Sequence, residues 1–181
     1  MTENMWTIVL DETSIPIPPE TLVDEQCDNL RTLTHGRVIA KIVSYRHNSD
    51  NSAFIRQIFN AILAEFSPNA VQQDLGPAAQ NCFTFEFFIT SAKVNNYKFR
   101  VFFLTYGIDF YPLVIRLDDD IAAEIGAEIG AEIGTEQNIF CKKETEFKAF
   151  LKKILNSPKV AKVVNTLHSM ALQEERKLRA V

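Results

Sequence analysis

The strongest constraint on the fold comes from three aromatic and β-branched runs in the middle of the chain: CFTFEFFIT (82–90), YKFRVFFLT (97–105) and DFYPLVIRL (109–117). Runs of this composition and length favour β-strands. The connections between them, SAKVNN and YGI, are too short for a parallel crossover. The sequence therefore predicts an antiparallel meander of three strands.

Alternation along the first two runs predicts which side chains share a face of this sheet. One set is Phe83, Phe85, Phe87 and Ile89, which alternates with Cys82, Thr84, Glu86 and Phe88. The next run alternates Tyr97, Phe99, Val101 and Phe103 with Lys98, Arg100, Phe102 and Leu104. One face is thus continuously apolar, and the other becomes apolar towards one end. We expect one covered face and one partly covered face.

Further elements are expected on both sides of the meander. MWTIVL (5–10) indicates a strand or an extended arm, RVIAKIVSYR (37–46) a strand, and NIFC (138–141) a short edge strand. Apolar residues at helical spacing predict helices over about 18–34, 54–66, 143–157 and from Pro158 onward, with a loop over 69–81. Gly36 is a plausible helix stop, and Ser157 a helix cap.

The predicted fold class is therefore α+β. A mainly antiparallel sheet, formed by the meander at about 82–117 and one or two further strands, is packed by N-terminal and C-terminal helices. The 181 residues, of which 46% are hydrophobic and 23% charged, fit one domain over 1–181.

Charge and cysteine content restrict the partners and the compartment. The net charge of −4 gives no long-range attraction to phosphate backbones, so nucleic acid is not expected as a partner. Three scattered cysteines, Cys27, Cys82 and Cys141, indicate reduced thiols. With no signal peptide and no apolar run of about 18 residues, we expect a cytoplasmic protein without a membrane span.

Carboxylates follow the third run directly, at Asp118, Asp119 and Asp120. The simpler interpretation is that one of them caps the next helix. The alternative is a divalent metal site, to which Glu86 on a neighbouring strand would add an oxygen.

Other catalytic patterns are weak. His35, His47 and His168 form no metal-binding pair, and His47 has the most polar neighbours. There is no Gly-x-Ser-x-Gly, and no glycine-rich loop suited to phosphates. We expect no cofactor.

The chain contains 14 phenylalanines, which is a heavy aromatic content. Core packing explains most of them, yet Phe87–Phe88 and Phe102–Phe103 place rings on both faces of the sheet. The candidate binding residues are Phe88, Phe102, Lys98 and Arg100. A protein partner or self-association as a homodimer would use this surface. Stacking of RNA bases is disfavoured by the acidity of the chain.

Residues 123–134 repeat Ala-Glu-Ile-Gly three times. In a helix each four-residue step advances about 40° beyond a full turn, so no residue type keeps one face. We expect a surface helix end at about 121–135 that was expanded by duplication.

The sequence therefore favours a non-catalytic binding, adaptor or accessory protein of a bacterial system, acting through an aromatic sheet face or groove. The alternative is a divalent-metal-dependent hydrolase that uses Asp118, Asp119 or Asp120 with Glu86.

Overall fold

The computed structural model describes residues 17–45, 82–94, 96–129 and 138–179, with side chains up to Ile125 in the third of these segments. They form helix α1 (Pro19–Leu33), strands β1 (Ile39–Ser44), β2 (Phe83–Thr90), β3 (Lys98–Tyr106) and β4 (Leu113–Leu117), helix α3 (Asp119–Ile129), strand β5 (Asn138–Cys141), and helices α4 (Glu144–Leu155) and α5 (Pro158–Arg179). The expected strand at 5–10, the helix at 54–66, the loop at 69–81 and His47 lie outside the described residues.

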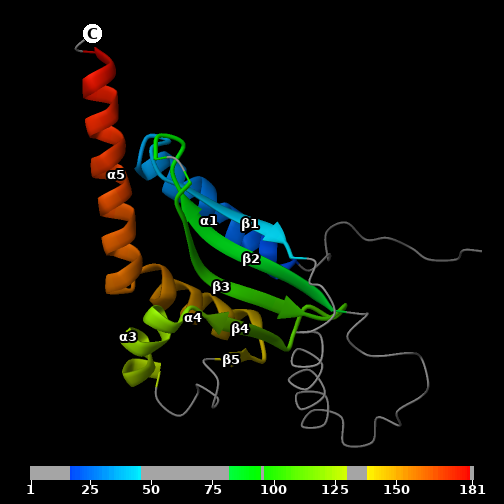
Figure 1. Ribbon diagram of the computed structural model, residues 1–181. Helices are drawn as coiled ribbons and strands as arrows, with labels where there is room; N and C mark the ends of the chain where they lie inside the picture. Colours follow the sequence, from blue (N-terminus) through cyan, green and yellow to red (C-terminus); the bar gives the residue numbers. More distant parts are fainter. Residues whose placement is uncertain (1–16, 46–81, 95, 130–137, 180–181) are drawn as a thin grey trace, which may run out of the picture.

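The five strands form one sheet in the order β1-β2-β3-β4-β5, and every neighbouring pair is antiparallel. Figure 1 shows this twisted sheet with α5 standing at one end of it. The predicted meander, the strand at 37–46 and the edge strand at 138–141 are all present. The α+β fold expected from the sequence is confirmed.

Helix α1 ends shortly before Gly36, as the sequence indicates, but His35 and Gly36 together terminate it. The N–H of Gly36 donates to the carbonyl of Arg31 (2.8 Å), and the N–H of His35 donates to that of Thr32 (3.2 Å). These two bonds make a Schellman motif. His35 has φ 52° and Gly36 has φ 74°, so the left-handed position next to the helix belongs to His35 and not to the glycine.

The start of α5 also follows the prediction. The Ser157 Oγ accepts the N–H of Val160 (3.3 Å), and Pro158 is the first helical residue. The strand predicted over 109–117 is shorter than expected, because only Leu113–Leu117 pairs with β3. Pro112 precedes it without an N–H to donate, and Phe110 has φ 65°.

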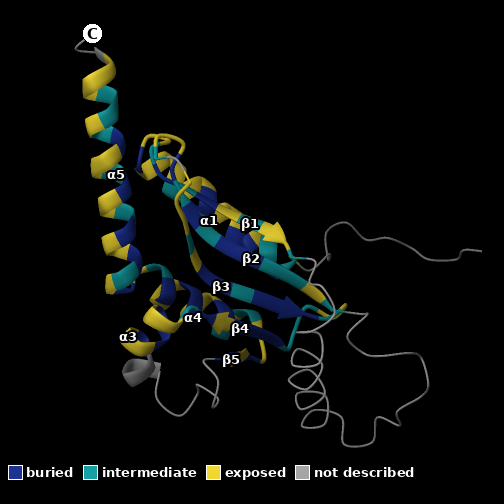
Figure 2. Cartoon of the chain, viewed as in Figure 1, coloured by how far each residue is buried: buried dark blue, intermediate teal, exposed yellow. Residues whose placement is uncertain are grey.

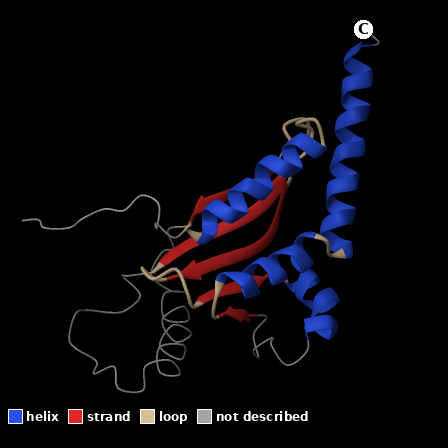
Figure 3. Cartoon of the chain, turned by 180° about the vertical axis from the view of Figure 1, so that it is seen from behind, coloured by secondary structure: helices blue, strands red, loops and turns tan. Residues whose placement is uncertain are grey.

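Helices α1 and α4 both lie against the same face of the sheet (Figure 3). The core between them and the sheet is apolar, and Figure 2 shows its buried residues along the strands and on the inner sides of these helices. Helix α4 contributes Phe147, Phe150, Leu151 and Ile154 to it, and the strands contribute Phe87, Phe102, Leu104, Leu113 and Ile115 among others. At one end the Tyr106 hydroxyl donates to the Glu20 carboxylate of α1.

A β-bulge interrupts the pairing of β2 with β3. Phe87 lies opposite Phe102, but the next residue, Phe88, lies opposite Arg100. Val101 is therefore an extra residue with no partner on β2, and one extra residue reverses the alternation of side chains beyond it. The predicted alternation of β3 is wrong for this reason: Phe102 and Leu104 face the core, whereas Phe103 lies on the opposite face.

None of the helices within the described residues combines the length and the apolar character needed to cross a membrane.

Candidate functional site

The face of the sheet opposite α1 and α4 is here called the outer face. On strands β1 to β4 it carries Lys41, Val43, Glu86, Phe88, Lys98, Arg100, Phe103 and Arg116. Its exposed residues include Lys41 and Val43 on β1, Lys98 and Arg100 on β3, Arg116 on β4, and Phe140 on β5. Further across the same face, Val114 and Asn138 are buried. The accessible part of the outer face is therefore a patch of mixed cationic and aromatic character.

Strand register places seven of these side chains in two neighbouring rows, while Lys98 lies opposite Thr90, beyond the row of Arg100. The first row runs from Lys41 through Phe88 to Arg100. The second row runs across four strands, through Val43, Glu86, Phe103 and Arg116. Because adjacent strands lie about 4.8 Å apart, residues that neighbour each other in a row are in contact range.

Glu86 is the centre of the patch. Its side chain is only 4% exposed, and its two oxygens accept hydrogen bonds from Lys98 Nζ (2.7 Å) and Arg100 Nε (2.8 Å). Burial by itself would raise the pKa of the Glu86 carboxyl, but the hydrogen bonds and charges of Lys98 and Arg100 together hold that pKa below its usual value. Glu86 is therefore a fixed anion that anchors two cations.

Aromatic rings support the same two cations. Lys98 Nζ lies 4.3 Å from the centroid of the Phe88 ring, and Arg100 Cζ lies 4.7 Å from that of Phe103. Tyr45, just after β1, packs on Phe103 with the ring centroids 4.9 Å apart and the planes tilted by 59°. Each cation thus has an ion pair and a cation–π contact, which restrict its conformations. Both side chains remain 48% exposed.

The bulge at Val101 makes this arrangement possible. Arg100 and Phe103 are three positions apart, so in a regular strand they would point to opposite faces. The extra residue brings both to the outer face, opposite Phe88 and Glu86. Bulges commonly redirect side chains in this way at functional sites. The Val101 carbonyl also accepts the N–H of Asp118 (3.0 Å), which ties the bulge to the start of α3.

Three of the four binding residues named from the sequence, Phe88, Lys98 and Arg100, lie together in this patch. Phe102 does not. Its exposure is 0%, and it stacks on Phe87 in the covered core with ring centroids 4.8 Å apart. Sequence reasoning missed Phe103 and Tyr45. The pair Phe102–Phe103 signalled a ring on each face, but not which ring belonged to which.

The acidic candidates have separate roles. The Oδ1 of Asp118 accepts the N–H of Asp120 (3.2 Å), so Asp118 caps α3, as the simpler interpretation predicted. Asp120 pairs with Lys159 of α5, Glu86 pairs with Lys98 and Arg100, and Asp119 is exposed. Over the ranges that the structure covers, no three His, Cys, Asp or Glu side chains gather closely enough to hold a metal ion. The arrangement does not bring Glu86 and the three aspartates into one site.

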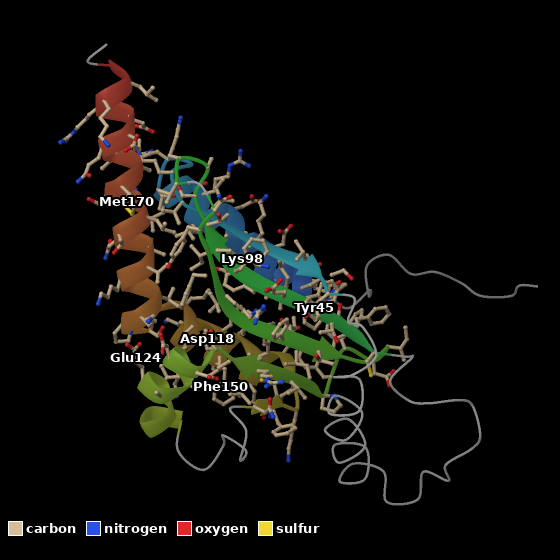
Figure 4. The ribbon with its side chains drawn as sticks, viewed as in Figure 1. Tyr45, Lys98, Asp118, Glu124, Phe150 and Met170 are labelled. Carbon is tan, nitrogen blue, oxygen red and sulfur yellow. The ribbon has the colours of Figure 1, made fainter. Side chains whose placement is uncertain are left out.

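The first copy of the repeat takes part in packing. Ile125 is 3% exposed, and the Glu124 carboxylate accepts the N–H of Lys159 (2.7 Å) in the first turn of α5. A carboxylate at this end of a helix is favourable. Figure 4 labels Glu124 and Asp118 near the base of α5, and Lys98 and Tyr45 along the strands. Residues 127–129 of the second copy end α3, and the remaining residues of the repeat, 130–134, lie outside the described residues.

A groove of about 220 Å³ lies between α1 and the edge strand β1, lined by Asp24, Cys27, Asp28, Arg31 and residues 39–43. Burial, together with the charges of Asp24 and Asp28, raises the pKa of the Cys27 thiol to about 12. Cys27 is therefore a neutral packing residue at ordinary pH and not a reactive thiolate. The groove is lined by both acidic and basic side chains.

Comparison with known proteins gives no guide to the function: no family model, no curated protein and no solved structure matches the chain.

Proposed function

We propose that the protein is a non-catalytic binding or adaptor protein that contacts a protein partner through the outer face of β1–β3. The observation that carries this proposal is the pair Lys98 and Arg100, held by the buried Glu86 and by two rings while remaining 48% exposed. Ordered, half-exposed cations beside aromatic rings suit recognition, because little conformational entropy is lost when they bind.

The carboxylates support binding over catalysis. A metal-dependent hydrolase needs several oxygens converging on one ion. Here Asp118 serves as a helix cap, Asp120 pairs with Lys159, and Glu86 is saturated by its two cations. Each of these carboxylates therefore already has a partner, and within the described residues no three acidic, cysteine or histidine side chains converge on one point.

The test is affinity capture from the native host with the wild-type protein, Arg100→Gln and Lys162→Gln. Lys162 is an exposed cation on α5, so its replacement controls for the loss of one positive charge. We expect Arg100→Gln to reduce the recovered partner about tenfold, because a charge-assisted hydrogen bond is lost, while Lys162→Gln leaves recovery unchanged. Equal recovery with all three proteins would contradict the proposal.

The partner can also be a second copy of the chain, and light scattering distinguishes this case. Self-association gives a mass above the 20.6 kDa of the single chain. If the outer face is the dimer interface, Arg100→Gln shifts the mass towards that value, and Lys162→Gln does not.

A further inference from the structure

We infer that the outer face recognises carboxylates on an acidic segment of the partner protein, and that Arg100 and Lys98 are the residues that bind them. This inference rests on the proposed function and names the chemistry of the partner.

The donors of the two cations are only partly used. Arginine carries five N–H donors, and Arg100 uses its Nε for Glu86, which leaves the Nη pair that binds a carboxylate through two parallel hydrogen bonds. Lysine carries three donors, and Lys98 uses one of them for Glu86. Glu86 thus fixes the inner side of each cation and leaves donors on the half-exposed outer side.

The charge of the patch is opposite to that of the whole chain. Among the described residues of the outer face on β1–β3, Lys41, Lys98 and Arg100 are positive and Glu86 is negative, so these four side chains sum to +2. The chain as a whole has a net charge of −4. A local excess of this kind attracts a short acidic segment at close range and determines where it docks.

A protein segment fits this surface better than a single-stranded nucleic acid. Nucleic acids bind sheets by stacking their bases on exposed rings. Here the faces of Phe88 and Phe103 are already in contact with Lys98 and Arg100, at 4.3 Å and 4.7 Å. The rings therefore serve to hold cations, and the cations serve to bind the ligand. The net negative charge of the chain further opposes a long polyanion.

The inference is tested with a fluorescent peptide of alternating Glu and Gly residues, whose binding is followed by anisotropy. A matched peptide with Gln in place of Glu and an oligothymidylate of equal charge are the comparison ligands. We expect the Glu peptide to bind, the Gln peptide to bind at least about tenfold more weakly, and the oligothymidylate to bind more weakly than the Glu peptide.

Variants of Arg100 and Lys98 distinguish an effect on peptide binding from an effect on folding. Arg100→Gln is expected to weaken the Glu peptide about tenfold and Lys98→Gln somewhat less, with Lys162→Gln as the unchanged control. Arg100→Lys keeps a cation for Glu86 but loses the planar fork. Its free energy of unfolding should therefore equal that of the wild type, but it should bind the Glu peptide several-fold more weakly than the wild type does. Wild-type affinity in both Arg100 variants would overturn the inference.

The affinity-capture experiment shows whether the proposed function or the inferred acidic ligand is wrong. If Arg100→Gln loses the native partner but the Glu peptide neither binds nor competes with it, the proposed function stands and the acidic ligand is wrong. If the oligothymidylate competes better than the Glu peptide, the ligand is a nucleic acid and the inference is likewise overturned. If Arg100→Gln retains the native partner, the proposed function itself has failed.

Discussion

The two faces of the sheet use the same strands and many of the same residue types, yet they serve different purposes. On the face covered by α1 and α4, aromatic rings pack on each other and on aliphatic side chains, as Phe87 does on Phe102. On the outer face, Phe88 and Phe103 pack against cations that are anchored to Glu86. A phenylalanine therefore contributes apolar burial on one face and orients a charged group on the other.

The comparison is tested most directly by replacing two adjacent phenylalanines. Phe102→Ala removes a ring with 0% exposure from a packed core, and we expect it to lower the free energy of unfolding by about 3–5 kcal/mol. Phe103→Ala removes a half-buried ring and should cost about 1–2 kcal/mol. Urea denaturation measures both variants. If Phe103→Ala costs more than Phe102→Ala, the assignment of the two faces is wrong.

The next largest effect is expected at the anchor of the outer face. Glu86→Gln leaves Lys98 and Arg100 without their shared anion, and it should lower the free energy of unfolding by about 1–2 kcal/mol, since both cations are half exposed. Glu144→Gln is the control. Glu144 pairs with Lys148 at 2.5 Å on the surface of α4, and its loss should cost less than about 0.5 kcal/mol.

A third test concerns the pH at which this anchor acts. The pKa of the Glu86 carboxyl in the folded protein lies below its ordinary value of 4.5. Its stabilising contribution is therefore complete above about pH 4.5 and is lost as the pH falls through the lower folded value. The stability difference between the wild type and Glu86→Gln should be constant near neutral pH and shrink below about pH 4.5. A difference that grows on acidification would contradict the direction of this pKa shift.

A smaller effect is expected at Asp118, which lies between the end of β4 and the start of α3. Asp118→Ala removes the cap of α3 and should cost about 1 kcal/mol, whereas Asp119→Ala, at an exposed first-turn position, should cost less than about 0.5 kcal/mol. Thermal unfolding of the two variants compares them. Equal losses would mean that the side chain of Asp118 contributes no cap.

The smallest effect is expected from the repeat, which belongs to neither face. Deleting residues 127–134 removes two of the three copies and keeps Glu124 and Ile125, which cap and pack against α5 and the core. We expect the free energy of unfolding to change by less than about 0.5 kcal/mol, because glycine-containing copies contribute little helix stability. A large loss in a thermal melt would show that the later copies are structural.

Much of the fold was predictable because its signals are local. Strand composition and short connections identified the meander, apolar residues at helical spacing identified α1, α4 and α5, and Ser157 with Pro158 marked the start of α5. The cap at Asp118 was predictable for the same reason, since a side chain and a backbone N–H two positions away determine it.

The composition of the outer face was only partly predictable. Phe88, Lys98 and Arg100 were found from alternation, because β2 is regular and β3 is regular up to Arg100. Phe102 and Phe103 were assigned to the wrong faces because alternation was continued through Val101. Tyr45 was missed because its contact with Phe103 joins segments far apart in the chain.

The sequence by itself determined which segments become strands and helices, and that rings and cations alternate along the central strands. Only the tertiary structure decided which of those rings meet the cations. The physical reason is the unpaired Val101: a bulge depends on how two strands pair and on the Asp118 N–H that its carbonyl accepts. Neither is visible along β3 alone. That single residue brings Phe103 beside Arg100 and leaves Phe102 in the core.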